Sequence, residues 1–201
     1  MINLQKGGNI NLAKEAAGVT VFRIGLAWDA NATGGADFDL DAAAIPCKAD
    51  GKAVGPDAIC FYHQLDWGNG ALKHSGDERT GAAEGDDETI TVDLSKMPAE
   101  VEKVVVIVNI HDAKNRNQNF GQVKNAKVHL YEGAEGNKVV ANYDLEEDAS
   151  MSRCLVFCEL YKKDGDWKFK AINESKGSAN EVIYRDILRG FGLDVDNSPA
   201  I

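Results

Sequence analysis

Hydrophobic and polar residues alternate along most of the chain with the period of two that is typical of half-buried β-strands. Between positions 88 and 94, for example, Ile90, Val92 and Leu94 share one face. The run from Lys103 to Ile110 is apolar at its centre, as expected of a strand covered on both sides. Asp164-Gly165, a pair that favours a tight hairpin turn, separates two further runs. The pattern predicts strands over residues 20–28, 37–45, 58–62, 88–94, 103–110, 127–131, 138–143, 155–163 and 166–172.

About ten short strands without alternating helices predict an all-β protein, a two-sheet β-sandwich. One helix is predicted over Ala179–Arg189, with Asn180 as its cap and Gly190 or Gly192 at its end. Residues 95–102 are expected to form a turn of helix between two strands. We therefore predict a β-sandwich domain over residues 1–175. Residues 176–201 form a C-terminal helix and tail, docked on the sandwich or extending from it.

The acidic residues are concentrated in one part of the chain. Residues 29–88 hold thirteen Asp and Glu against four Lys and Arg, an excess of nine in a chain whose net charge is −10. Like charges about 5 Å apart repel by roughly 3 kcal/mol at an effective dielectric constant near 20. A fold that gathers them needs a compensating cation or raised carboxyl pKa values. Crowded oxygen ligands suit a hard divalent cation, above all calcium.

The first acidic run alternates with apolar residues. In an extended strand Asp37, Asp39 and Asp41 would project to one side, while Phe38 and Leu40 face the core. An EF-hand loop started at Asp37 fails, because its sixth position is Ala rather than Gly and its twelfth is Lys rather than Glu. We therefore expect a sandwich in which loops at one end bring this run and other acidic segments together.

Further acidic segments are flanked by glycines, which permit sharp turns and expose backbone carbonyls to a cation. Asp29 ends a predicted strand, and Glu159 lies in an apolar strand where either an arginine such as Arg153 or a metal could pair with it. The candidate metal ligands are Asp29, Asp37, Phe38, Asp39, Asp41, Asp77, Glu78, Glu84, Asp86, Asp87, Glu88 and Glu159. The expected cofactor is Ca²⁺, two or more ions.

These residues as a set resemble the tellurite-resistance TerD family of stress proteins. The matching stretches cover about residues 2–172 in family order: IGLAWD (24–29), DFDLD (37–41), GDERTG (76–81), GDDETI (85–90), NFGQV (119–123), ELY (159–161) and DWKF (166–169). The resemblance implies a calcium-binding β-sandwich whose ions lie in an acidic depression, and a role in bacterial tellurite, phage or general stress resistance. Glu78 departs from the family, which commonly has Asn there.

Several function classes are disfavoured or left as alternatives. The acidic balance argues against nucleic-acid binding and against attraction to anionic lipid, and no segment is long enough to insert in a membrane. A cytoplasmic protein is expected, in contact with the inner membrane only through a partner. The partners implied are other proteins of a tellurite-resistance operon, which could include a membrane component, and an oligomer is compatible with the sequence.

Two alternatives to a non-catalytic calcium module remain. A metal-dependent hydrolase could use the same carboxylates, with two metals activating water. A scaffold protein could bind partners through the polar loop 112–119 and the C-terminal helix, with calcium gating that surface. The four cysteines, Cys47, Cys60, Cys154 and Cys158, are predicted to be reduced. Cys154 and Cys158, four apart in a predicted strand, are expected to share one sheet face as small hydrophobic residues, with a zinc site that recruits His63 as the alternative.

Overall fold

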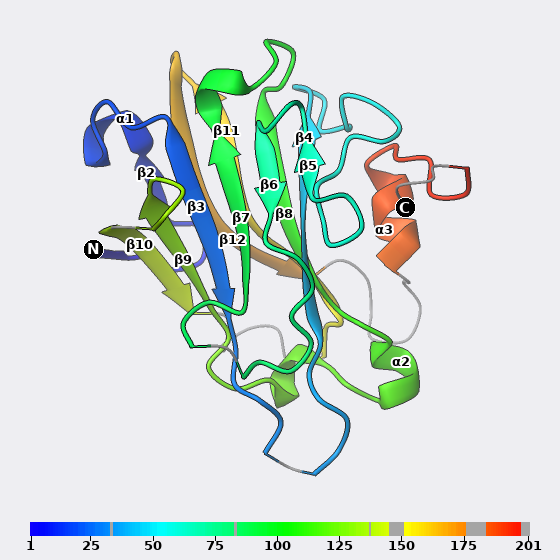
Figure 1. Ribbon diagram of the computed structural model, residues 1–201. Coiled ribbons are helices and arrows are strands. Elements are labelled where there is room, and N and C mark those ends of the chain that lie inside the picture. The colour runs from blue at the N-terminus through cyan, green and yellow to red at the C-terminus, as the bar shows by residue number, and fades with distance from the viewer. Residues whose placement is uncertain (33, 83, 137, 145–150, 176–183, 198–201) are drawn as a thin grey trace.

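The computed structural model describes residues 1–197 apart from 33, 83, 137, 145–150 and 176–183. This part of the chain forms two β-sheets that lie face to face (Figure 1). Sheet A contains, in spatial order, β1 (Ile2–Asn3), β10 (Lys138–Asp144), β9 (Lys127–Glu132), β3 (Val21–Ala27), β7 (Glu88–Asp93), β6 (Leu72–His74) and β5 (Asp66–Trp67). Sheet B contains β2 (Asn9–Asn11), β12 (Asp166–Ser175), β11 (Cys154–Lys163), β8 (Lys103–Ile110) and β4 (Leu40–Cys47). The predicted all-β sandwich is confirmed.

The helical elements are short. They are α1 (Leu12–Glu15), α2 (Ala113–Arg116), α3 (Tyr184–Gly190) and the 3₁₀ turns η1 (Leu94–Lys96) and η2 (Phe120–Gln122). All neighbouring strands pair in antiparallel fashion except β1 and β10, which are parallel. None of the described helices has the length and apolar character that crossing a membrane requires.

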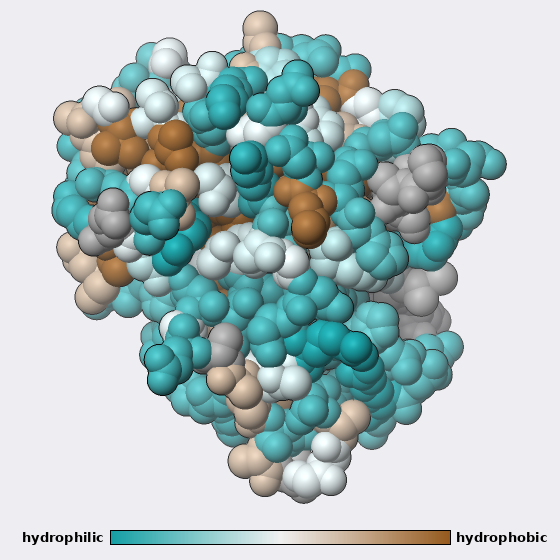
Figure 2. Space-filling model, in the orientation of Figure 1, coloured by the Kyte–Doolittle hydropathy of each residue, from teal (hydrophilic) through white to brown (hydrophobic). Residues whose placement is uncertain are grey.

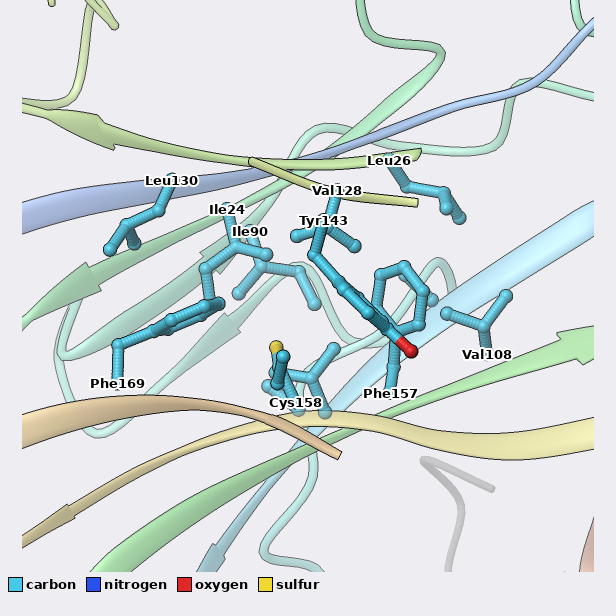
Figure 3. Close-up of a cluster of buried hydrophobic side chains, with 14 of the residues drawn as sticks. Ile24, Leu26, Ile90, Val108, Val128, Leu130, Tyr143, Phe157, Cys158 and Phe169 are labelled. Carbon is cyan, nitrogen blue, oxygen red and sulfur yellow. The ribbon is translucent and has the colours of Figure 1, made fainter. Parts of the chain in front are cut away.

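The main core lies between the two sheets, where the predicted alternation buries one face of each strand. Ile24 and Leu26 of β3 and Ile90 of β7 point from sheet A toward Val108 of β8 and Phe157 of β11 in sheet B (Figure 3). Each of these five residues is at most 3% exposed. Burying side chains of this size contributes about 1.5–3 kcal/mol each, so the inter-sheet core fixes the ends of the strands that carry the acidic loops.

A second buried cluster covers the outer face of sheet B. There Ile45 of β4 and Ile107 of β8 pack against Ile187 and Leu188 of α3, and Ile59 completes the layer. This packing explains why β8 is apolar on both faces, as the sequence predicted. All four cysteines are buried free thiols. Cys154 and Cys158 do not share a face as predicted: Cys158 lies in the inter-sheet core and Cys154 in the outer cluster, because the register of β11 shifts between Val156 and Cys158.

Several predicted elements differ from the observed ones. Residues 58–62 are not a strand, because Cys60 forms only an isolated bridge with Ala44 and Phe61 one with Gln64. The strand predicted over 37–45 begins at Leu40, so Asp37 and Asp39 precede β4. The helical turn predicted over 95–102 is limited to η1, a single 3₁₀ turn that ends at Lys96, two residues before Pro98. Part of the predicted 179–189 helix lies outside the described residues, and its remainder is α3.

Candidate metal centre

Three connections meet at one end of the sandwich, the lower end in Figure 1. They are the β3–β4 loop, the β6–β7 loop and the segment from β8 to β9 that includes α2. The surface at this end is mostly hydrophilic (Figure 2). The antiparallel pairing of β4 with β8 brings the β3–β4 loop next to the segment that follows β8, because Leu40 faces Ile110 and Asp41 faces Asn109. The sheet therefore places the acidic run beside the polar segment that follows β8.

Asp39, Asp41 and Asp77 form the centre of this end. One carboxylate oxygen from each residue lies within 4.8 Å of the others. Asp39 and Asp41 are each 3% exposed, whereas Asp77 is exposed on the β6–β7 loop. Phe38 and Leu40 are buried in the inter-sheet core, so the alternation predicted for this run holds even though β4 begins only at Leu40. Two carboxylates at this separation repel by about 3 kcal/mol at an effective dielectric constant near 20.

Cationic and amide side chains contact the cluster from its rim. Arg116 of α2 lies 3.4 Å and Arg79 3.9 Å from Asp39 Oδ2. His111 Nδ1 lies 3.8 Å from Asp41 Oδ2, and Asn109 donates a side-chain hydrogen bond to the Asp41 carboxylate. The arginine contacts are longer than charge-assisted hydrogen bonds usually are. The rim therefore compensates the carboxylates only in part.

Burial and mutual repulsion shift the protonation of these carboxyl groups. Burial, followed by the charges of Glu88, Asp39 and Asp77, raises the pKa of Asp41 to about 8. The pKa of Asp39 is raised mainly by burial, and the charges of His111 and Arg116 oppose the rise. Raised carboxyl pKa values mark a site where negative charge is insufficiently compensated. A divalent cation would supply the missing compensation, so the donor set fits a hard metal ion.

Glu78 shapes the loop that carries Asp77. Its Oε2 accepts hydrogen bonds from the backbone N–H of Thr80 (3.0 Å) and Gly81 (2.7 Å), and its Oε1 accepts one from the Thr80 hydroxyl (2.7 Å). Burial alone would raise the pKa of Glu78, but these hydrogen bonds lower it. The Glu78 carboxylate thus closes a turn beside the cluster.

Glu88 is fully buried at the start of β7. Its Oε2 accepts a hydrogen bond from Ala42 N at 2.8 Å and lies 3.4 Å from His74 Nε2. Because His74 Nδ1 accepts a hydrogen bond from Gly76 N, the ring proton lies on Nε2, which is also 3.1 Å from Ala42 O. Burial raises the pKa of Glu88 against these hydrogen bonds. Glu88 of sheet A is therefore hydrogen-bonded to sheet B at Ala42, the residue that follows Asp41.

The two residues before Glu88 point elsewhere. Asp87 Oδ2 accepts a hydrogen bond from Trp28 N at 2.9 Å. Asp86 lies against Gly25 of β3, its Oδ1 2.6 Å from His129 Nδ1 and its Oδ2 3.8 Å from an Arg23 guanidinium nitrogen. Three consecutive acidic residues of the sequence thus have three separate sets of contacts.

The remaining predicted ligands lie around or away from the cluster. Asp37 lines the same hollow as Asp39, together with Arg79, Thr80 and Arg116. Asp29 accepts a hydrogen bond from Asn125 at 2.6 Å, and Glu84 is exposed on the β6–β7 loop.

Phe38 and Glu159 complete the predicted set. The Phe38 carbonyl accepts a hydrogen bond from the Trp28 indole at 2.9 Å. Glu159 lies 3.9 Å from Lys103 Nζ, and it faces Val105 of β8, four positions or about 13 Å from Asn109. The ion-pair partner of Glu159 is thus Lys103 rather than Arg153, and Glu159 does not belong to the cluster of Asp39, Asp41 and Asp77.

Sequence reasoning missed the residues of the rim. Arg79, Arg116, His111 and Asn109 were not among the candidate residues of the site. Gln118 Nε2, also not predicted, donates to the carbonyls of Ala36 (2.8 Å) and Asp37 (3.2 Å) and so fixes the entry to β4. The polar loop 112–119, which the sequence suggests as a partner surface, was the available signal for Arg116 and Gln118.

Comparisons with known proteins agree with the resemblance found in the sequence. The family model described as TerD domain matches residues 1–182. The chain is 44% identical to general stress protein 16U of Bacillus subtilis over 96% of its length and 98% of that protein. It is 43% identical to tellurium resistance protein TerD of Serratia marcescens over 86% of its length and 90% of that protein.

A solved structure agrees in fold. The crystal structure of a homologue of telluride resistance protein (TerD) from Streptomyces coelicolor superposes with a TM-score of 0.63 at 23% identity, covering 80% of this chain and 92% of that one. The extent of the family match and the identity to proteins of nearly the same length settle the classification. The chain belongs to the TerD family of tellurite-resistance and stress proteins.

Proposed function

We propose that this protein is a non-catalytic calcium-binding module of the tellurite-resistance type of stress response. It binds two or more Ca²⁺ ions in the acidic loop cluster and acts through protein partners. The observation that carries the proposal is the convergence of Asp39, Asp41 and Asp77, whose oxygens lie within 4.8 Å of one another. Two of these carboxylates are buried with raised pKa values, which is the electrostatic condition that a divalent cation relieves.

Calcium is favoured over magnesium by the kind of site. Calcium accepts six to eight oxygen ligands in flexible geometry, whereas magnesium requires a near-ideal octahedron. Asp77 belongs to an exposed loop with glycines at 76 and 81, both at positive φ, so its carboxylate can adjust to an ion. Asp37, which lines the hollow next to Asp39, offers further oxygens for a second ion.

The contacts of the cluster support binding rather than catalysis. The side chains that approach Asp39 and Asp41 are arginines, a histidine and an amide, which neutralise or hydrogen-bond the carboxylates. Burial raises the pKa of Cys47, Cys60 and Cys154 to about 12, so these thiols are poor nucleophiles. We propose a cytoplasmic protein whose partners are other tellurite-resistance operon proteins, a membrane component among them. This part rests on family membership.

Calorimetric titration of chelator-treated protein tests the proposal. We expect calcium to bind at two or more sites with dissociation constants of about 10⁻⁷ to 10⁻⁵ M, and magnesium to bind much more weakly. Zinc serves as the second comparison, because it prefers nitrogen and sulfur ligands. Absence of calcium heat in low-salt buffer, or preference for zinc or magnesium, would overturn the proposal. Calcium-dependent turnover of phosphoester substrates would favour the hydrolase instead.

A further inference from the structure

Trp28, the residue that follows β3, contacts each of the segments that build the acidic cluster. It is 3% exposed and belongs to the inter-sheet core. Its indole Nε1 donates a hydrogen bond to Phe38 O at 2.9 Å. Phe38 directly precedes Asp39, so this bond fixes the backbone from which the Asp39 side chain projects.

The β6–β7 loop rests on the same indole ring. A Cβ atom added at Gly81 would lie 2.4 Å from Trp28 Nε1 and 2.5 Å from its Cδ1. Gly81 is also held by Glu78, whose Oε2 accepts its N–H at 2.7 Å. The turn that carries Asp77 is therefore closed by Glu78 and packed without a side chain against Trp28.

The backbone of Trp28 makes the third connection. Its N–H donates to Asp87 Oδ2 at 2.9 Å, while Asp87 N donates to Leu26 O at 2.8 Å. The end of the β6–β7 loop is thus tied to the end of β3. Trp28 thus connects the end of β3 with the segment that leads into β4 and with two positions of the β6–β7 loop, Gly81 and Asp87.

We propose that Trp28 is a positioning residue of the calcium site, which holds the segments of Asp39 and Asp77 together before an ion arrives. The proposal rests on the proposed function. The carboxylates repel one another without a cation, so separate loops would move apart unless another contact opposed the repulsion. A site assembled in advance loses less conformational freedom on binding, and this gain appears as affinity.

Trp28→Phe tests the proposal because it keeps an aromatic ring and removes the donor to Phe38 O. We expect its calcium affinity to fall by about tenfold, the equivalent of about 1.4 kcal/mol. Trp167→Phe is the matched control: Trp167 lies in β12, packs at the edge of the core and contacts Lys162, and its replacement should leave the affinity unchanged. Equal affinities of wild type and Trp28→Phe would overturn the proposal.

A second readout works without calcium and separates this inference from the proposed function. Arg79 is an exposed trypsin site, with 66% of its side chain accessible, in the loop that Trp28 holds. In chelator, trypsin should cleave after Arg79 several-fold faster in Trp28→Phe than in wild type or Trp167→Phe, because local opening becomes more frequent. If wild type failed to bind calcium while Trp28→Phe was still cleaved faster, the proposed function would be refuted and the role of Trp28 in holding the loops would stand; unchanged cleavage would refute the role of Trp28.

If Trp28→Phe does not fold, the double variant Trp67→Phe/Trp167→Phe leaves Trp28 as the sole tryptophan with its contacts intact. Its emission in chelator should already be that of a buried indole and should change little at saturating calcium, because Trp28 makes its contacts before the ion binds. Emission of an exposed indole in chelator that becomes that of a buried indole only when calcium binds would overturn the proposal.

Discussion

Calcium binding should strengthen as pH rises, because an ion must displace the proton of Asp41. Burial and the neighbouring carboxylates raise the pKa of Asp41 to about 8 in the folded, calcium-free protein. Below that pH the group is mostly protonated and cannot act as an anionic ligand until the proton leaves. For one such group, affinity should rise about 50-fold between about pH 6 and pH 8, and level off above pH 8.

The same shift affects the stability of the calcium-free protein. A carboxyl whose folded-state pKa is raised stabilises the folded form below its unfolded pKa, near 4, and this contribution is lost as pH rises toward 8. The free energy of unfolding in chelator should therefore decrease from about pH 4 to about pH 8. Saturating calcium should reverse this trend over the upper part of the range, because binding keeps the carboxylate ionised.

Calorimetry in two buffers of different ionisation enthalpy measures both the affinity and the protons released on binding. His111, whose Nδ1 lies 3.8 Å from Asp41 Oδ2, could also make binding depend on pH. His111→Gln separates the two sources, since the pH dependence should persist in this variant. A constant affinity between about pH 6 and pH 8, or a pH dependence that disappears in His111→Gln, would refute the reasoning.

Three further predictions, each with its own substitutions, test other parts of the structure. Asp39→Asn should weaken calcium binding by an order of magnitude or more. Asp164→Asn should change calcium affinity little, because Asp164 is an exposed turn residue that follows β11, about 30 Å along that strand from its end beside the cluster. Equal effects of the two substitutions by calorimetry would mean that calcium is bound by diffuse charge. Arg79→Gln should tighten binding about two- to fivefold at low salt by removing a competing cation 3.9 Å from Asp39, and weaker binding would contradict this. Gly25→Ala would place Cβ 2.0 Å from Asp86 Oδ2 and should cost about 1–3 kcal/mol in denaturant unfolding. Asp86→Ala should relieve that clash, so additive costs would count against it.

Local pattern was sufficient for much of the sandwich. The strand predicted over 103–110 coincides with β8, because its apolar centre is buried by two different clusters. The alternation of the 37–41 run correctly placed Phe38 in the core and Asp39 beside Asp41. Both features depend on neighbours along the chain, which the sequence displays directly.

The contacts of the acidic residues in segment 84–88 could not be predicted from local pattern in the same way. Asp86 and Glu88 receive their contacts from His129 and His74, residues that only the assembled sheets bring near. Residues 58–62 have a strand-like composition, yet they cover the outer face of sheet B instead of extending its ladder. Tertiary contacts decide these cases, and spacing along the chain contains little information about them.

The most direct test of the central claim is a crystal structure of the protein with calcium, using anomalous scattering to locate the ions. We predict anomalous density with carboxylate oxygens of Asp39, Asp41 and Asp77 about 2.3–2.6 Å away, and a second peak nearby that involves Asp37. Peaks confined to other acidic residues, or no peak at this end of the sandwich in a crystal saturated with calcium, would contradict the account.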